Sequence, residues 1–501
     1  MGKLRYRLLF LFLFLLLLIP ATEAREWAIV GPRALGMGGA GVAVANDATA
    51  AYWNPAAYGL FKSKARGDYG KRDWSAVGDV GIGAQLHEDL GKQINTILQY
   101  DYNNFTSGQI AADDVPEFLQ LVSDLKTFDE NKNRAATIIE NAGVGVQVGH
   151  FGIGGYVFGD VSAKGDLDLV NIAPVTSGTT FTLNDFTNPA NYGCSPCTGG
   201  TYLTAQQKAD LDTFLAGLGW SPTQRTDYIN AMDFGLTQAN TSGATIPADI
   251  VNDIETVAAL ADAAANSGGS FADNQSRLLF KGIAIAEVPF TYGQAITESF
   301  AVGGNIKYMK ARVYNTAVPL FNTDFGDALD KAMDDYEDSQ SFGIDIGILY
   351  HLSDTLRLGL VGRNVNSPKF DMKRLSPGDS DHITEKGQAR VGVAFKPMGF
   401  LTLATDLDIT KNETTVSGDY RSQNACAGLE LDIVRFLKLR IGAYKNLAEN
   451  DIGFVYTAGF GLNLWLVNVD VGASMAEETS ELDDNDIPKE AKVEMALSML
   501  F

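Results

Sequence analysis

The chain ends with the stretch Lys492-Val493-Glu494-Met495-Ala496-Leu497-Ser498-Met499-Leu500-Phe501, and this stretch decides the fold class. One face of an extended strand here is apolar and consists of Val493, Met495, Leu497, Met499 and Phe501. The other face consists of Lys492, Glu494, Ala496 and Ser498. Successive side chains point to opposite faces of a strand, so the pattern indicates a two-faced strand. The alternatives are a strand of an ordinary sandwich and a strand of a membrane-spanning barrel.

The same period of two recurs along the C-terminal half of the chain. Apolar residues alternate with Gly, Ser, Thr, Asn or Asp in 342–352, 403–409, 454–464 and 467–475. Strands with one apolar face for lipid and one small or polar face for a lumen are the signature of a transmembrane β-barrel. We therefore predict an all-β fold, a transmembrane antiparallel β-barrel.

Composition agrees with a sheet protein and argues against a nucleic-acid partner. The 501 residues include 52 glycines but only 15 prolines, and 46% of them are hydrophobic. Lys and Arg number 39 against 61 Asp and Glu, for a net charge of −22. Nucleic-acid surfaces need clustered Lys and Arg. No basic stripe occurs in the sequence, so we predict no nucleic-acid partner.

The N-terminus reads as a secretory signal peptide over residues 1–24. Lys3, Arg5 and Arg7 precede an apolar run at 8–19, and small residues follow up to Ala24. A retained signal anchor is the alternative, but a helix that spans the membrane needs about 20 residues, and this apolar run is shorter. Removal of the peptide leaves 36 basic and 60 acidic residues, for a net charge of −24. After Ala24 no stretch of 18 residues is continuously apolar.

Alternation and turn signals predict fifteen strands after residue 76. They are 77–87, 92–103, 142–149, 152–168, 278–290, 297–313, 340–352, 355–366, 385–397, 400–410, 416–432, 436–446, 452–464, 466–476 and 490–501. If both termini are periplasmic the number must be even, so a further strand is expected at 61–74. The prediction is thus 16 strands in a barrel domain 61–501, or 14 if one hairpin is misread.

Short connections, such as 88–91, alternate with long ones, the longest at 104–141 and 169–277. The long connections carry helical periodicity at 113–140 and 203–265, and Thr204 with Gln207 resembles a capping box. Barrels have short periplasmic turns and long outer loops, so we predict helical extracellular insertions. These insertions would cap the barrel, collect a ligand or bind a partner; the alternative is a shielding loop.

Inward-facing charges are predicted to pair around the barrel wall. Asp406 and Asp408 lie on one strand, and the next two strands carry Glu430 with Asp432 and Lys438 with Arg440. Arg357, Arg363 and Arg390 are further inward bases. The functional hypothesis is an electrostatically selective pathway, and the alternative is simple neutralisation of wall charges.

Cysteine and histidine usage supports no metal site, cofactor or enzyme. Cys194 and Cys197 lie in a turn-like segment, and an oxidising compartment favours a small disulfide over zinc or redox catalysis. Cys426 is a single remaining cysteine on a lumen face. The four histidines are scattered, and no spacing supports a Ser-His-Asp site.

A glycine-rich motif follows the signal peptide. Residues 31–56 read GPRALGMGGAGVAVANDATAAYWNPA. Small residues at this density pack backbone closely, and Asn-Pro marks a turn. A nucleotide-binding loop is the rival interpretation, but the motif lacks G-x-G-x-x-G spacing and does not follow a strand. We predict a compact, buried segment.

This motif resembles the start of outer-membrane barrels of the FadL-like superfamily, and its wording is closest to the TraF-like and PorV-like branch. The superfamily includes transporters of fatty acids and hydrocarbons, in which an N-terminal hatch plugs the lumen. The resemblance implies that residues 25–60 form such a plug. Its implied plug residues are Gly36, Met37, Gly38, Gly39, Asn46, Asp47, Trp53, Asn54, Pro55 and Ala56. Nothing in the chain has the βαβ redox pattern of the thioredoxin-like protein also called TraF.

The terminal Phe501 resembles the assembly signal of bacterial outer-membrane proteins, which implies contact with the barrel-assembly machinery. The sequence therefore predicts a barrel in the outer membrane of a Gram-negative-type bacterium, surrounded by outer-membrane lipid. We expect passive transport of hydrophobic small molecules such as fatty acids or hydrocarbons. The alternative is a non-transporting surface scaffold or a secretion- or conjugation-associated protein. A lateral wall opening and an apolar internal pocket favour transport, whereas a lumen filled by charged side chains favours the scaffold.

Overall fold

The computed structural model describes residues 26–60, 74–100, 110–171, 182–268, 274–320, 325–482 and 485–500. The predicted signal peptide and Phe501 lie outside these residues. The predicted strand at 61–74 lies outside them too, except for its last residue, Trp74, which begins the first strand of the barrel.

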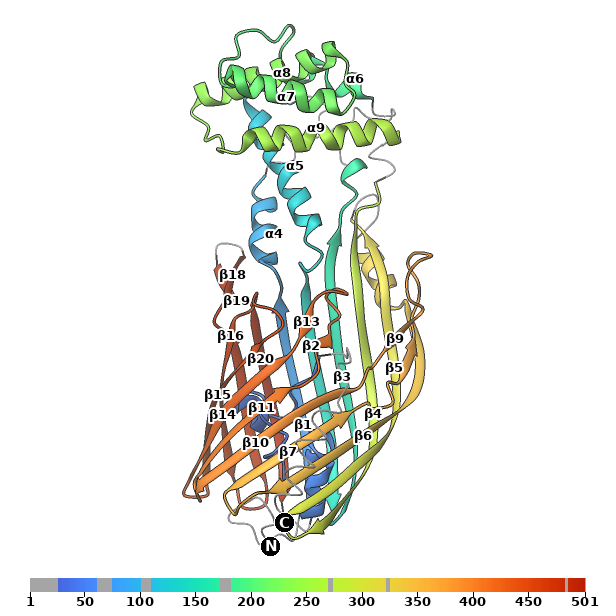
Figure 1. Cartoon of the computed structure of the whole chain (residues 1–501), viewed down its shortest axis with the longest axis vertical. Coiled ribbons are helices and arrows are strands. Elements are labelled where there is room, and N and C mark those ends of the chain that lie inside the picture. The colour runs from blue at the N-terminus through green and yellow to red at the C-terminus, as the bar shows by residue number, and fades with distance from the viewer. Residues whose placement is uncertain are drawn as a thin grey trace.

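Fourteen strands of the described chain close into one antiparallel barrel (Figure 1). In barrel order they are β1 (Trp74–Leu86), β2 (Ala136–Val148), β3 (Phe151–Asp166), β4 (Arg277–Thr297), β5 (Phe300–Pro319), β6 (Tyr336–His351), β7 (Leu356–Arg363), β10 (Gln388–Met398), β11 (Leu401–Asp408), β14 (Asn424–Ile433), β15 (Leu437–Asn446), β16 (Phe454–Asn463), β17 (Asn468–Ala476) and β20 (Glu490–Leu500). The last strand pairs with the first, with Ser75 opposite Leu500, and this closes the ring. The predicted β-barrel is confirmed.

Three short hairpins belong to the connections of the barrel. They are β8 (Lys369–Asp371) with β9 (His382–Thr384), β12 (Asn412–Glu413) with β13 (Arg421–Ser422), and β18 (Thr479–Leu482) with β19 (Asn485–Pro488).

The outer surface of the barrel is apolar and exposed. In β20, Val493, Met495 and Leu497 are about half exposed, whereas Lys492 and Glu494 on the opposite face are buried. A closed barrel satisfies every backbone hydrogen bond, and an apolar outer band suits hydrocarbon. The protein is therefore an outer-membrane β-barrel. Among the described helices, none is long and apolar enough to cross a membrane.

One predicted strand was wrong. Residues 92–103 were predicted as a strand, but Leu90–Leu98 form the helix α4. Leu90, Ile94 and Ile97 are spaced by four and three residues, which places them on one side of a helix. The predicted short turn at 88–91 is therefore part of a long connection. Without the strand at 92–103, fourteen of the predicted strands after residue 76 remain, and these match the fourteen strands of the described barrel. The sixteenth strand, expected at 61–74, was added only to make the number even.

The other predicted strands match, with shifted ends. The strand predicted at 416–432 begins at Asn424, because Val416 and Tyr420 belong to a loop that packs inside the barrel. Both termini of the ring lie at one end, which we call the inner end, and the opposite end is the outer end (Figure 1).

The helical insertions stand at the outer end of the barrel, opposite both termini (Figure 1). The longer helices are α5 (Val115–Glu130), α7 (Ala205–Gly217), α8 (Pro222–Ser242) and α9 (Ile250–Ser267), with α10 (Phe325–Met333) near the barrel rim. Shorter helices are η4 (Ala112–Asp114), η5 (Leu169–Asn171), α6 (Leu183–Phe186) and η6 (Pro189–Tyr192). The predicted capping box at Thr204 and Gln207 is present, and Ser221 with Gln224 forms another. α5 and α7–α9 share a hydrophobic core of their own.

Candidate functional site

Residues 26–60, which we call the N-terminal segment, lie within the ring of strands near the inner end (Figure 1). The segment contains three short helices, α2 (Pro32–Gly36), α3 (Ala50–Trp53) and η1 (Pro55–Leu60). Nearly all of its residues are buried. They pack against the inward faces of strands on both sides of the barrel, from β3 to β7 and from β14 to β20.

Small residues allow this close approach between segment and wall. Gly38 has φ +66°, a left-handed conformation that favours glycine, and a Cβ there would collide with the backbone of Ala427. Met37 lies against two inward-facing wall glycines, Gly428 and Gly442. Gly36 and Gly39 likewise contact the wall, at Arg440 and Cys426. The glycines of the motif and those of the wall thus allow the N-terminal segment and the barrel wall to pack closely against each other.

The Asn54-Pro55-Ala56 turn docks on β4–β6. Asn54 is fully buried, and its Nδ2 donates to the Ile348 carbonyl at 3.0 Å, while its Oδ1 accepts from the Ala56 backbone at 3.1 Å. Pro55 lies against the inward-facing Gly303. Trp53 stabilises the fold of the segment, because its Nε1 donates to the Val30 carbonyl at 2.9 Å.

A first charge cluster joins the N-terminal segment to β14, β15 and β17. Arg33 donates twice to Glu430, at 2.8 and 3.0 Å, and Arg440 donates to the same carboxylate at 2.8 Å. Arg440 also bonds Asp470 at 2.6 Å, and Arg33 reaches Asn46 Oδ1 at 3.1 Å. The glutamate is therefore shared between the wall and the segment.

Asp406 and Asp408 do not join that cluster, although the sequence predicted one ladder. Asp406 accepts hydrogen bonds from the backbone N–H groups of Gly41 and Val42, at 2.7 and 2.9 Å. Asp408 pairs with Arg390 through two bonds of 2.5 and 3.0 Å, and both side chains are fully buried. The predicted charges form separate groups, most of which also hold the N-terminal segment.

A further charge cluster contains Arg363, which was predicted as an inward base, but its other members were not predicted from the sequence. Lys307 lies 3.1 Å from Glu287 and 3.2 Å from Asp345, and Arg363 lies 3.2 Å from Glu287. Arg363 also stacks on the ring of Tyr52 in the N-terminal segment, 3.9 Å from its centroid. The sequence contains a signal for this cluster, because its charged residues occupy inward-facing positions of otherwise apolar strands.

Part of the wall in the outer half of the lumen is an apolar patch. We call Ile283, Ile285, Met309, Ala311 and Val313 the wall patch; all are buried and face inward from β4 and β5. The β8–β9 hairpin covers this patch with Phe370, Met372 and Ile383. This hairpin belongs to the connection between β7 and β10.

The strand ladder also changes beside the wall patch. β6 pairs with β7 only from Ile346 to His351, although β6 itself begins at Tyr336. The chain turns away after Arg363, where Asn364 and Ser367 adopt positive φ values of 49° and 51°. The residues that would continue β7 toward the outer end instead lead into the hairpin over the wall patch.

A second loop, residues 409–423, folds across the lumen toward β2 and β3. Thr415 donates to Asp160 at 2.7 Å, and Tyr420 packs with Ala135 and forms a hydrogen bond to Asp451. Burial alone would raise the pKa of Asp451, but hydrogen bonds from His87 and Tyr420 hold this pKa below its usual value. The lumen is therefore covered at its outer end as well.

Small cavities border the N-terminal segment. One of about 80 Å³ is lined by Arg33, Asn46, Asp47 and Lys438, among others, and one of about 40 Å³ is lined by residues that include Glu26. Neither approaches the ~300–1,000 Å³ of typical ligand pockets. Burial, with a smaller contribution from neighbouring carboxylates, raises the pKa of Glu26 to about 8. Among the described residues, no group of three or more His, Cys, Asp or Glu is arranged to hold a metal ion.

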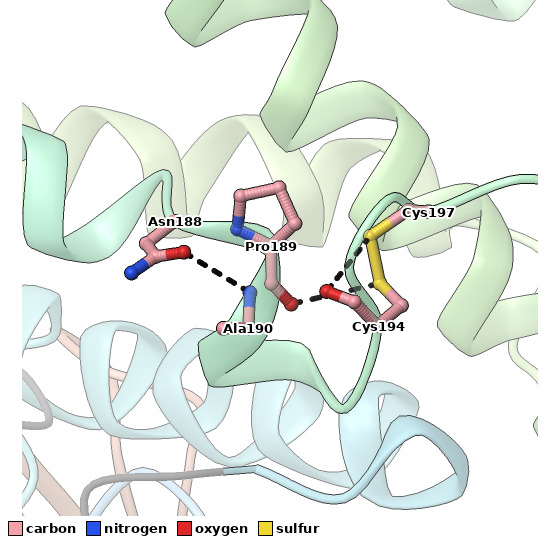
Figure 2. The surroundings of a disulfide bond; sticks show 5 residues. All are labelled: Asn188, Pro189, Ala190, Cys194 and Cys197. Carbon is pink, nitrogen blue, oxygen red and sulfur yellow. Dashed lines mark hydrogen bonds between the residues drawn. A yellow bond between two sulfur atoms is a disulfide. The ribbon is translucent and has the colours of Figure 1, made fainter.

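The two cysteines at 194 and 197 lie in the helical insertion, away from the lumen. Figure 2 shows the disulfide between Cys194 and Cys197 beside the η6 turn, where Asn188 Oδ1 accepts from the Ala190 backbone at 3.1 Å. Both cysteines belong to the hydrophobic core of the insertion. The bond therefore stabilises this insertion rather than the barrel.

Fold and lumen together define an outer-membrane barrel with an internally packed N-terminal segment. A family model described as "F plasmid transfer operon, TraF, protein" matches residues 51–408, and the chain belongs to this family. The TraF-like assignment made from the sequence is confirmed. No curated protein matches the chain.

Several solved structures are similar to the chain. A FadL homologue from Pseudomonas aeruginosa is 10% identical, with 96% of this chain and 99% of that chain covered and a TM-score of 0.43. The toluene transporter TodX from Pseudomonas putida is 10% identical over 96% of this chain and 98% of that one, with a TM-score of 0.39. The CymD monoaromatic hydrocarbon channel is 10% identical over 95% and 98%, with a TM-score of 0.40.

Proposed function

We propose that this barrel is a passive channel for hydrophobic small molecules, and that the structure represents its closed state. The observation that carries the proposal is the wall patch. The interior of a water-filled barrel is polar, yet Ile283, Ile285 and Met309 face inward. An apolar inward patch offers a site that apolar molecules prefer to water.

The β8–β9 hairpin is the movable cover of this patch in our proposal. Only Phe370, Met372 and Ile383 of this connection pack on the patch. Burial of one such side chain contributes about 1.5–3 kcal/mol. A hydrophobic molecule that reaches the patch would replace these contacts with its own, so the hairpin and ligand would compete for one surface.

The N-terminal segment is the inner plug in this proposal. The segment fills the inner half of the lumen. The plug residues either line this part of the lumen or stabilise the fold of the segment, and they are Gly36 to Gly39, Asn46, Asp47 and Trp53 to Ala56. The segment is held to the wall by hydrogen bonds, ion pairs and packing, among which Arg33 with Glu430 and Asn54 with Ile348 are prominent. Displacement of the segment would join the outer half of the lumen to the periplasm.

A second candidate is a surface scaffold that presents its helical insertion, and two observations favour it. The lumen around the N-terminal segment contains buried charged side chains such as Glu430 and Arg440. The helical insertion has its own hydrophobic core, so it is a folded unit rather than a loop. If the protein is a scaffold, the barrel anchors it in the membrane, and neither the β8–β9 hairpin nor the N-terminal segment moves.

The deciding experiment measures uptake of a labelled fatty acid or alkane in a transport-deficient host. Phe370→Ala weakens the cover, while Asp371→Ala alters the exposed neighbour on the same hairpin and is the matched control. We expect uptake above background with the unmodified protein, faster uptake with Phe370→Ala, and no change with Asp371→Ala. Outer-membrane recovery and heat-modifiable gel mobility verify that each variant is folded. If folded protein gives no uptake in any form, the channel proposal fails and the scaffold remains.

A further inference from the structure

The inner turns of the barrel differ between its two sides. In the described residues, the turns β2–β3, β4–β5 and β6–β7 are polar at their tips, with Gly149-His150, Glu298-Ser299 and Ser353-Asp354. The turns β10–β11, β14–β15 and β16–β17 carry large apolar residues. We call Phe400, Val434, Phe436, Trp465 and Leu466 the apolar rim; their exposures are 53%, 85%, 51%, 96% and 65%.

The backbone of these turns does not favour the residues that occupy them. Val434 and Arg435 have φ values of 48° and 61°, and Trp465 has φ 75°. Tight hairpin turns with two positive φ values prefer Asn-Gly or Asp-Gly, and a β-branched residue there is strained. Turn geometry therefore does not explain these side chains, and exposure to water does not favour them either.

The apolar rim is continuous with the lipid-facing surface of the strands that carry it. These strands have 8 to 11 residues, and a spanning strand needs about 9–11. The rim continues their outward face, where Leu403, Leu439 and Phe460 are about 40% exposed. It therefore extends the lipid-facing band at the inner end.

Charge follows the same division of the inner end. Arg435 is exposed within the apolar rim beside the half-buried Asp432, whose carboxylate accepts from the Arg435 backbone N–H at 3.0 Å. The polar turns, in contrast, expose Glu298 and Asp354. A cation beside aromatic residues suits the phosphate level of a phospholipid leaflet, and carboxylates do not. Continuity with the lipid-facing band and this charge division both point to lipid rather than to a protein partner.

We propose that the apolar rim inserts into the headgroup region of the inner phospholipid leaflet while the polar turns stay in water. The barrel then sits deeper in the membrane on its β10–β17 side than on its β2–β7 side. Trp465 and Phe436 anchor this side at the interface, and Arg435 binds lipid phosphate. This inference concerns the seating of the barrel and does not depend on whether the barrel transports.

Tryptophan fluorescence of the full-length protein tests the proposal in vesicles of phosphatidylethanolamine and phosphatidylglycerol. Some of the lipid is brominated near the headgroup end of its acyl chains, because bromine quenches nearby tryptophan. The signal of Trp465 is the difference between the unmodified protein and Trp465→Phe. The matched control is Ser353→Trp in the Trp465→Phe background, which places a tryptophan on a polar turn of the same inner end.

We expect Trp465 emission to be blue-shifted and to lose roughly half of its intensity to brominated lipid, as an interfacial anchor would. The tryptophan at position 353 should emit as in water and keep its intensity. Heat-modifiable gel mobility confirms that both variants are folded. Emission of Trp465 as in water, without quenching, would overturn the proposal and leave the apolar rim free for a periplasmic protein. Equal quenching at both positions would overturn the difference in depth.

Discussion

The inner half of the lumen and the wall patch of its outer half are closed by different kinds of contact. In the inner half, buried charges and glycine contacts hold the N-terminal segment, as Arg33 with Glu430 and Gly38 at the wall illustrate. In the outer half, the β8–β9 hairpin covers an apolar wall patch through Phe370 and its neighbours. Charge pairs need exact partners and tolerate little change. Apolar contacts accept any apolar replacement, including a ligand, so the outer cover is the better candidate for movement.

The largest effect is expected when one partner of the buried ion pair between β10 and β11 is removed. Asp408→Ala leaves Arg390 buried without its carboxylate, and the free energy of unfolding should fall by about 3–5 kcal/mol. Urea unfolding of the protein in vesicles measures this loss. The double variant Arg390→Met with Asp408→Leu should recover most of it. Equal stability of Asp408→Ala and the unmodified protein would show that the pair does not stabilise the barrel wall around the N-terminal segment.

A smaller effect is expected at the glycine contact. Gly31 and Gly38 both have positive φ, so a side chain at either costs about 1–2 kcal/mol of conformational energy. A Cβ at Gly38 also meets the wall backbone, whereas at Gly31 it meets nothing within 4 Å. Gly38→Ala should therefore expose the N-terminal segment to protease faster than Gly31→Ala does. Identical cleavage rates for the two variants would show that close packing at Gly38 does not hold the N-terminal segment against the wall.

The pKa of Glu26 gives the inner half a pH dependence. Burial raises this pKa from 4.5 to about 8, so the folded protein keeps a proton that the unfolded chain releases. Stability is then highest below pH 4.5 and falls as pH rises from 4.5 to about 8. Glu26→Gln should remove this part of the fall, measured by urea unfolding between pH 4.5 and 8. An unchanged pH profile in Glu26→Gln would place the titrating group elsewhere.

The smallest effect is expected in the outer half. Tyr420→Phe removes the hydrogen bond to Asp451 and should cost about 1 kcal/mol, because the ring keeps its apolar contacts. Hydrogen exchange of residues 409–423 measures the local loss. Exchange at the N-terminal segment should stay unchanged, and a change there would mean that the two halves are coupled.

The sequence predicted the inner half better than the outer half, for physical reasons. Strict alternation, as in β20, indicates which residues face the lumen. The glycine-rich motif predicted a compact, buried segment. The alternation does not say which inward charges meet, because pairing depends on register; hence Asp406 binds backbone rather than another side chain. The wall patch escaped notice because Ile283 and Met309 look like ordinary strand residues until the fold shows their face. The helix α4 was misread because nine residues offer few repeats of either period.

The most direct test of the central claim changes the wall patch itself. Met309→Gln makes the patch polar without adding a charge, and Lys310→Gln alters the exposed neighbour on the same strand as a control. Initial uptake of a labelled fatty acid is measured in the transport-deficient host at equal levels of folded protein. We predict that Met309→Gln lowers the uptake rate severalfold while Lys310→Gln leaves it unchanged. Equal uptake by both variants and the unmodified protein would contradict the claim that hydrophobic molecules pass over this patch.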